Sequence, residues 1–233
     1  MDEARQGNRG DAMSEIRILV TGFSAFPRAP VNPTQVLMEM LAAEPPDLGP
    51  DVRLRIEILP VEYQRAPDAL IRLGSEWPAD VAVHFGLAAN AKGFRLESTA
   101  RNRSSLTAVD AAGLLPASEL ICEGPATLPS SLPLKQIRGA LEAAGLPVQM
   151  STNAGAYLCN HVFYLSRAGT LTGFAPAMSG FIHVPFLDEQ LGHPGVRAPG
   201  LPSMSRKDLL EGARMILQTC AETARAARHP PSP

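Results

Sequence analysis

The chain alternates between two kinds of segment, and this alternation restricts its fold more than any other feature. Residues 16–23 (IRILVTGF) and 80–88 are short and apolar, which predicts buried strands, and residues 52–61 alternate between apolar and polar, which also predicts a strand. Segments with helical periodicity separate them, one with Pro33 near its first turn and the other covering residues 62–77. A β-α-β-α-β order predicts a three-layer α/β/α fold, in which a mainly parallel, twisted sheet has helices on both faces.

The second half of the chain continues this pattern. We expect strands at 93–102, 147–152 and 178–186, and helices at 134–145, 154–169 and 205–227. Residues 104–133 are rich in Ser, Pro, Ala and Gly and have weak periodicity, which predicts a long loop or lid. The polar residues 1–15 predict a disordered leader and residues 228–233 a tail. This leaves residues 16–227 as a single predicted domain.

Charge and composition narrow the range of partners. The formal net charge is −2 and aromatic residues make up 5% of the chain, so neither nucleic acid nor an anionic membrane surface is expected as a partner. No apolar run approaches the roughly 18–20 residues that cross a bilayer, and the N-terminus has no apolar signal segment. Cys122, Cys159 and Cys220 form no CxxC pair, so neither a disulfide framework nor a zinc site is expected. The expected location is the reducing cytoplasm.

Cys159 is the first candidate for chemistry. It lies in STNAGAYLCNH (151–161), where a predicted strand is followed by a loop of small residues and then by a helix. Backbone N–H groups at the beginning of a helix can stabilise a thiolate, which is the nucleophilic form of a thiol, and can also stabilise an oxyanion. The alternative is a small core residue, a common role for cysteine in an apolar helix. Cys122 and Cys220 lack such surroundings, and we interpret them as structural.

A histidine base and an acidic residue could complete a catalytic group with this thiol. His183 lies near the end of the strand GFIHVPF, where it could be a general base or a hydrogen-bonded core residue. His84, in VAVHFGLA, has a similar setting and competes for the role of base. Glu97, in FRLEST, is the best acidic candidate for orienting an imidazole, with an ion pair to Arg95 or Arg101 as the alternative.

These segments resemble the pyroglutamyl peptidase I family of cysteine peptidases, also called pyrrolidone-carboxylate peptidases. STNAGAYLCNHVFYLS is very close to the nucleophile signature of the family, and GFIHVPFLDEQ is very close to its histidine signature. ILVTGFSAFPRAPVNPT, LPVEY, VHFGLA, LESTARN and PSMSRKDLLEGARMIL resemble further family segments and stand in the family's order. The resemblance extends from about residue 16 to about residue 225.

This resemblance implies a single-domain α/β cysteine exopeptidase that removes N-terminal pyroglutamate (5-oxoproline) from peptides through a thioester acyl-enzyme. It makes Cys159 the nucleophile, His183 the general base and acid, and Glu97 the residue that orients the imidazole. Phe23 and Phe26 match the aromatic residues that hold the lactam ring. The resemblance also implies N-terminally pyroglutamylated peptides as substrates, no metal or organic cofactor, and a homo-oligomer, either a dimer or a tetramer.

The chain departs from the family pattern at several positions, one of them Ala111, which follows Asp110 where the family has an Asp-Asn pair. GFSAFPR stands where the family usually has GFEPFGG, which puts Arg28 beside the expected ring pocket, and Thr107 stands where the family commonly has an arginine. Two alternative hypotheses rest on these departures. One is a diverged cysteine hydrolase that acts on another small N-acyl or lactam amide, and the other is a non-catalytic binding module on the same fold.

Overall fold

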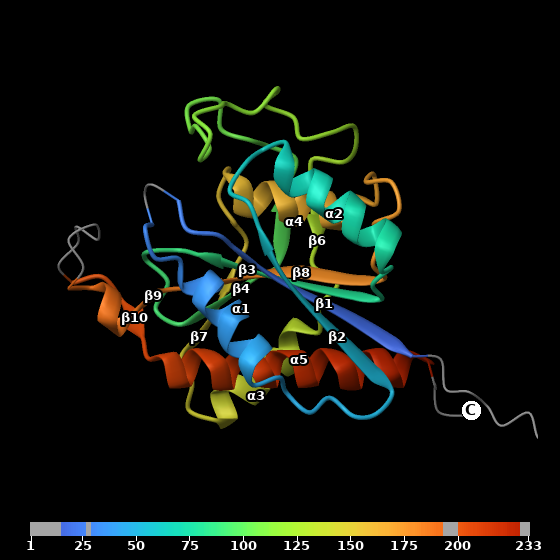
Figure 1. Cartoon of the computed structure of the whole chain (residues 1–233), viewed down its shortest axis with the longest axis vertical. Coiled ribbons are helices and arrows are strands. Elements are labelled where there is room, and N and C mark those ends of the chain that lie inside the picture. The colour runs from blue at the N-terminus through green and yellow to red at the C-terminus, as the bar shows by residue number, and fades with distance from the viewer. Residues whose placement is uncertain (1–14, 27–28, 193–199, 229–233) are drawn as a thin grey trace, which may run out of the picture.

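A six-stranded sheet forms the centre of the molecule, and helices lie on both of its sides (Figure 1). The computed structural model describes residues 15–26, 29–192 and 200–228. Across the sheet the strand order is β2-β1-β3-β8-β4-β7. These strands are β1 (Ile16–Phe23), β2 (Val52–Leu59), β3 (Val81–Leu87), β4 (Phe94–Glu97), β7 (Val148–Ser151) and β8 (Met178–Val184).

Two strands at one side of the sheet run against the other four. β2, β1, β3 and β8 are parallel, whereas β4 pairs antiparallel with β8 and parallel with β7. The sheet is mainly parallel, so the prediction of an α/β fold with such a sheet is confirmed. The antiparallel pair sets Arg95 opposite His183 and Glu97 opposite Phe181. The end of β4 therefore lies beside the middle of β8.

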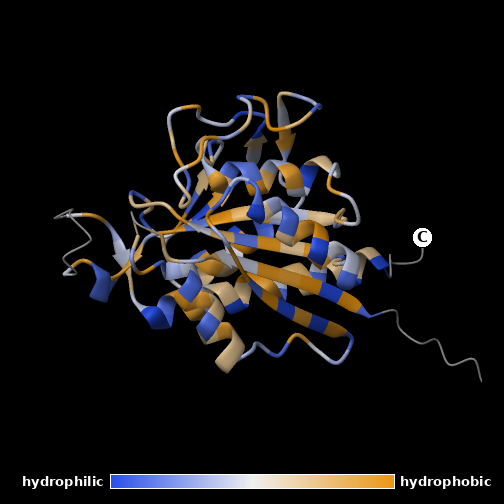
Figure 2. Ribbon diagram, turned by 45° about the horizontal axis from the view of Figure 1, so that its top comes forward, coloured by the Kyte–Doolittle hydropathy of each residue, from blue (hydrophilic) through white to orange (hydrophobic). Residues whose placement is uncertain are grey.

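The two faces of the sheet contribute to separate hydrophobic cores. The helices are α1 (Pro33–Ala43), α2 (Arg65–Glu76), α3 (Leu134–Ala143), α4 (Leu158–Ala168) and α5 (Arg206–Arg228). Ile18 and Val20 of β1 belong to the core formed with α1, α3 and α5, whereas Leu19 belongs to the core formed with α2 and α4. Successive strand residues point to opposite faces, so a strand covered on both faces is apolar throughout. The edge strand β2 alternates instead between hydrophobic and hydrophilic residues (Figure 2).

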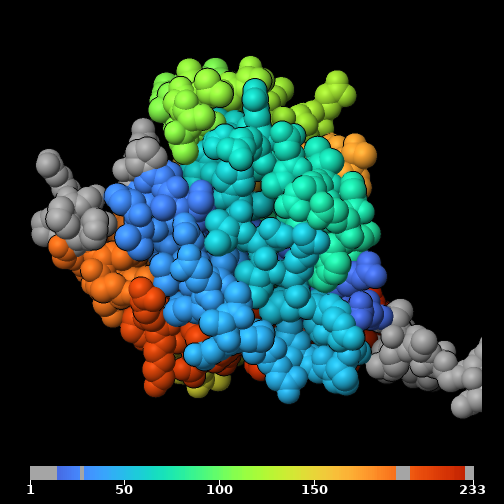
Figure 3. Space-filling view, viewed as in Figure 1, coloured from blue at the N-terminus to red at the C-terminus, as the bar shows by residue number. Residues whose placement is uncertain are grey.

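A long segment between β5 (Thr99–Arg101) and β6 (Thr127–Pro129) contains neither helix nor strand. It lies above α2 and α4 in Figure 1, and its atoms form the top of the molecule in Figure 3. The buried Asp110 carboxylate accepts hydrogen bonds from the N–H groups of Tyr63, Ala112 and Leu114, which attaches this segment to the chain after β2. Residues 104–133 were predicted as a loop, and they are irregular except for the short strand β6.

Most predicted limits differ from the structure by one to three residues, and two elements differ more. The helix expected from residue 154 begins at Leu158, because Gly155 has φ +84° and Tyr157 is extended. The strand expected at 93–102 is divided into β4 and β5. The short elements that remain are β9 (Phe186–Leu187), a 3-10 helix (Asp188–Gln190) and β10 (Ser203–Met204). The predicted leader and tail lie outside the described residues, apart from Glu15 and Arg228, and so does Arg28.

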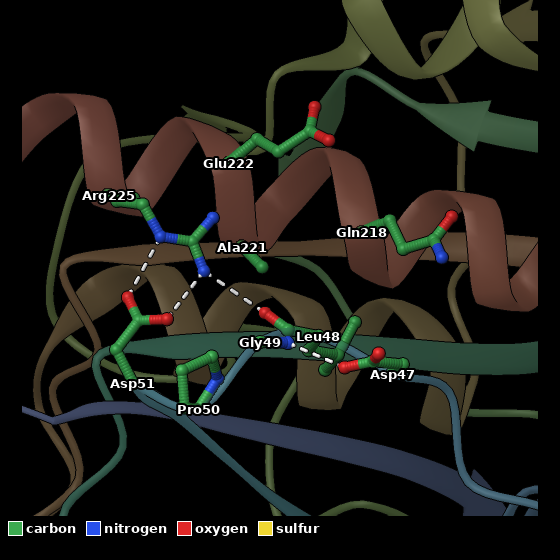
Figure 4. A pocket seen from close by; sticks show the side chains of 9 residues that line it. All are labelled: Asp47, Leu48, Gly49, Pro50, Asp51, Gln218, Ala221, Glu222 and Arg225. Atoms are coloured by element: carbon green, nitrogen blue, oxygen red, sulfur yellow. Dashed lines mark hydrogen bonds and ion pairs between the residues drawn. The ribbon is translucent and has the colours of Figure 1, made fainter.

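Arg225 attaches the last helix to the turn that precedes β2 (Figure 4). Its guanidinium donates to both carboxylate oxygens of Asp51, at 2.8 and 2.7 Å, and to the carbonyl of Leu48 at 3.0 Å. A hollow of about 550 Å³ lies at this junction. The contact fixes α5 across one face of the sheet.

Candidate active site

Cys159 is the second residue of α4 and lies where the unpaired N–H groups of the helix begin. The preceding loop is turned by small and polar residues. Ser151 Oγ accepts from the Asn153 N–H at 3.1 Å, and Asn153 Oδ1 accepts from the Gly155 N–H at 3.1 Å. The helix N-terminus carries a partial positive charge, so it favours negative charge on the sulfur or on an oxyanion formed beside it.

Gly86 of β3 allows the thiol to approach the sheet. A Cβ atom at this position would lie 2.9 Å from Cys159 Sγ and 2.7 Å from the ring of Phe181. Contacts this short require the neighbouring atoms to move, so only glycine accommodates the observed arrangement. Gly86 is also the partner of His183 across the β3–β8 pair. The register of these two strands therefore brings the imidazole beside the thiol.

His183 forms a buried hydrogen bond with Glu97. The distance from His183 Nδ1 to Glu97 Oε1 is 2.8 Å, and the two residues are 5% and 0% exposed. Glu97 lies diagonally across the β4–β8 pair from His183, on the same face of the sheet. Nδ1 is engaged by the carboxylate, which leaves Nε2 for the sulfur of Cys159. Glu97 Oε2 is buried and has no hydrogen-bond partner among the described residues.

The surroundings of His183 favour its protonated form. Burial alone would lower the pKa of this histidine, but the charge and hydrogen bond of Cys159, together with those of Glu97, outweigh burial and raise the pKa to about 9. The imidazole is therefore a cation at neutral pH. A cation beside the sulfur favours the thiolate, and the same proton is available to a leaving group.

Phe23 and Phe26 line a small pocket that opens onto Cys159. The pocket has a volume of about 50 Å³ and is mainly apolar. Its other lining residues are Asn32, Val61, Leu87, Tyr157 and Leu158. The pocket fits a small ring better than a long side chain, and the reacting carbonyl of a ligand held there would lie beside the sulfur.

Polar side chains hold the loops that border this pocket. Thr34 Oγ1 accepts from the Phe23 N–H at 2.9 Å, and Asn32 Oδ1 accepts from the Thr34 N–H at 3.0 Å as the cap of α1. Gln190 Nε2 donates to the carbonyl of Val31 at 2.6 Å, which joins the chain after β8 to the chain after β1. The positioning roles of Asn32, Thr34 and Gln190 were not predicted from the sequence. The Asn-Pro-Thr helix start was a signal for the first two, but no local pattern indicated the third.

His84 does not reach the thiol as a base. It is completely buried between Thr21 Oγ1, at 2.8 Å from Nδ1, and Ser166 Oγ, at 2.9 Å from Nε2. Burial lowers the pKa of His84 to about 3, so the ring is neutral. Both ring nitrogens are engaged by hydroxyl groups, and we assign His84 to the core between α4 and the sheet.

The alternative partners proposed for Glu97 lie elsewhere. Arg95 Nη2 donates to Asn90 Oδ1 at 3.1 Å, and Arg101 Nη2 donates to the carbonyl of Thr152 at 3.3 Å. Of the described residues, only His183 forms an ion pair with Glu97. The structure thus brings Cys159, His183 and Glu97 together.

Other features of the described residues contribute no competing site. The hollow beside Arg225 (Figure 4) is lined by none of the predicted site residues. No group of three or more His, Cys, Asp or Glu side chains in the described part of the chain could hold a metal ion. Within residues 15–26, 29–192 and 200–228, no helix has both the length and the apolar character needed to cross a membrane.

The chain is similar to known proteins over most of its length. The sequence profile of a family described as "Pyroglutamyl peptidase" matches residues 16–223. A pyrrolidone-carboxylate peptidase of Vibrio vulnificus is 34% identical over 215 residues, which cover 91% of this chain and 96% of the relative. One from Pyrococcus furiosus is 34% identical over 208 residues, which cover 89% of this chain and 99% of the relative.

Solved structures of such peptidases share the fold. A mutant pyrrolidone carboxyl peptidase from Pyrococcus furiosus has a TM-score of 0.80 and 33% identity, covering 89% of this chain and 99% of the other. The enzyme from Fervidobacterium islandicum has a TM-score of 0.81 and 30% identity, with the same coverage of 89% and 99%.

Proposed function

The chain belongs to the pyroglutamyl peptidase family, and we propose that Cys159, His183 and Glu97 form its catalytic triad. It is a cysteine peptidase that removes N-terminal pyroglutamate from peptides. The observation that carries the assignment of residues is the buried His183–Glu97 hydrogen bond, with Cys159 on the other side of the imidazole and a small apolar pocket open to the sulfur. Neither alternative hypothesis is favoured over this function.

The first half of the reaction forms an acyl-enzyme. The Cys159 thiolate attacks the pyroglutamyl carbonyl carbon, and backbone N–H groups at the beginning of α4 stabilise the oxyanion. When the intermediate collapses, the C–N bond breaks and the leaving amine takes the proton of the His183 imidazolium. The pyroglutamyl group remains attached to Sγ as a thioester.

The second half returns the enzyme to its starting state. Water attacks the thioester carbonyl while its proton passes to the neutral His183, and the C–S bond then breaks to release pyroglutamate and the thiolate. Throughout, the Glu97 carboxylate orients the ring through Nδ1 and stabilises its charge. Phe23 and Phe26 hold the lactam, which has no free amino group and so needs no acidic partner.

The proposal also includes the cellular location of the protein and its oligomeric state. Cys122, Cys159 and Cys220 are all free, which suits a reducing cytoplasm. Leu114 and Leu120, on the segment between β5 and β6, are 52% and 63% exposed, and a contact between copies of the chain would bury them. We expect a homo-oligomer, and light scattering coupled to gel filtration measures its mass directly.

The proposed triad is tested by following the release of a fluorescent amine from a pyroglutamyl amide. Cys159→Ala should reduce kcat by about 10,000-fold or more, because no other group can form the acyl-enzyme. Cys122→Ala is the matched control and should retain the native rate. A Cys159→Ala variant that keeps a tenth of native turnover would exclude this nucleophile.

A further inference from the structure

A hollow of about 530 Å³ borders the loop that leads to the nucleophile. One wall is formed by Asn153, Gly155 and Ala156, which directly precede α4. The facing wall is formed by β5 and the chain that follows it. The residues of that wall are Arg101, Arg103, Ser104, Ser105, Leu106, Thr107 and Glu119. No step of the proposed mechanism uses this hollow.

The hollow is close to the reacting sulfur. Ala156 lies three residues before Cys159, and an extended chain spans at most about 3.6 Å per residue. The two Cα atoms are therefore within about 11 Å of each other. A peptide of two or three residues covers the same distance when it leaves the scissile carbonyl.

The order of the strands supports a position for the hollow on the leaving side of the site. Phe23 of the ring pocket is on β1, His183 is on β8 and Glu97 is on β4. The next strand is β7, and the loop that follows it forms the wall of the hollow. In the strand order, β1 and β7 thus lie on opposite sides of the β8–β4 pair that carries His183 and Glu97.

The hollow has an excess of positive charge. Among the described residues, the Arg101 side chain has no acidic partner within 4.0 Å, and its guanidinium makes one hydrogen bond, from Nη2 to the carbonyl of Thr152. Arg103 is paired with Glu119 at 2.9 Å, and both of these side chains are more than half exposed. A guanidinium with unused N–H groups matches the two oxygens of a carboxylate better than any neutral group.

We propose that this hollow is a subsite for the leaving peptide and that Arg101 binds its C-terminal carboxylate. The inference rests on the proposed function, because a leaving peptide exists only if a pyroglutamyl bond is cleaved. It specifies the substrate class as short pyroglutamyl peptides, with two or three residues after the pyroglutamate and a free C-terminus. Arg103 supplies a second positive charge, and its ion pair with Glu119 weakens the attraction of that charge for the carboxylate.

The test compares pyroglutamyl-Ala-Ala with its C-terminal amide at low ionic strength. The native chain should cleave the free acid about fivefold better in kcat/KM, the preference expected for one partly exposed charge pair, and the difference should lie in KM. Arg101→Gln should abolish the preference. Glu119→Gln should increase it, because Arg103 is released from its partner. Arg138→Gln, an exposed arginine of α3 paired with Glu142, is the control and should leave the preference unchanged.

A pyroglutamyl fluorescent amide separates the subsite from the proposed function, because its leaving amine carries no carboxylate for Arg101 to bind. Arg101→Gln should cleave this substrate at the native rate, which shows that the variant is folded and its triad intact. Equal cleavage of acid and amide by the native chain, or an undiminished preference in Arg101→Gln, would overturn the subsite. Failure of the native chain to cleave the fluorescent amide would overturn the proposed function itself.

Discussion

Two carboxylate ion pairs at different places in the molecule have nearly the same length but very different surroundings. His183 Nδ1 lies 2.8 Å from Glu97 in the candidate active site, and Arg225 Nη2 lies 2.7 Å from Asp51 where α5 meets the turn before β2. The side chains of the first pair are 6% and 0% exposed, whereas those of the second are 34% and 11% exposed. The environment, and not the distance, distinguishes a pair suited to chemistry from one suited to attachment.

The number of hydrogen bonds to each carboxylate makes the same distinction. The guanidinium fork of Arg225 occupies both oxygens of Asp51. The imidazole of His183 occupies one oxygen of Glu97 and leaves the buried Oε2 without a partner among the described residues. A buried acceptor without a donor costs stability. The chain carries this cost where a carboxylate is needed to hold a cation beside the sulfur.

The largest effect is expected when the carboxylate of Glu97, in the active-site pair, is replaced by a neutral amide. The same replacement at Asp51 is the comparison. Glu97→Gln should lower kcat/KM by about 100-fold to 10,000-fold, because the neutral amide neither stabilises the imidazolium nor fixes its orientation. Asp51→Asn should leave kcat/KM unchanged. Both variants are measured with the fluorescent pyroglutamyl amide, after circular dichroism has confirmed their fold. A Glu97→Gln variant within tenfold of native activity would remove the distinction drawn between the two pairs.

A smaller effect is expected from adding one methyl group beside the sulfur. Gly86→Ala places a Cβ 2.9 Å from Cys159 Sγ, so the thiol must move and kcat should fall by about 10-fold to 100-fold. At Gly139, an exposed position of α3, an added Cβ would meet no atom within 4 Å outside its own stretch of helix. Gly139→Ala is therefore the control, and it should stabilise the fold by about 0.5–1 kcal/mol without altering kcat. Equal kcat in the two variants would contradict the tight contact at Gly86.

The pH profile should show the raised pKa of His183. Because this pKa is about 9, kcat/KM should fall roughly tenfold per pH unit above about pH 9, as the proton for the leaving amine is lost. Glu97→Gln should move this limb to lower pH, since one of the charges that stabilise the imidazolium is gone. A profile that falls already from about pH 6.5, the value of an ordinary histidine, would rule out the buried cation.

The same pKa also predicts the pH dependence of folding. The pKa of His183 in the folded chain lies above its unfolded value of about 6.5, so folding favours the protonated form. The stability contributed by this group is complete below about pH 6.5 and is lost as the pH rises through about 9. The free energy of unfolding should therefore fall in alkali as His183 loses its proton.

Local patterns in the sequence predicted β1 to the residue, because a strand buried on both faces leaves a continuous apolar segment. The beginning of α4 was wrong by four residues, since the apolar periodicity continues through Ala154 although Gly155 turns the chain. The direction of β4 left no local signal. His183 and Glu97 meet only through the antiparallel register of β4 and β8, across 86 residues of chain. The residue types in a sequence indicate that such a pair could form, but the register of the strands determines whether it does.

The smallest effect is expected at the exposed pair, and it should appear in acid. The hydrogen bonds from Arg225 lower the pKa of Asp51, so the stability that this carboxylate contributes is present above about pH 3.8 and is lost as the pH falls through the lower folded value. At neutral pH, Asp51→Asn should reduce Tm by about 1–4 °C, as expected for a partly exposed ion pair. The difference in Tm between native and variant should narrow as the carboxylate is protonated, whereas alkali should leave it unchanged. A difference that grows in alkali instead would show that the two pairs are coupled through the sheet.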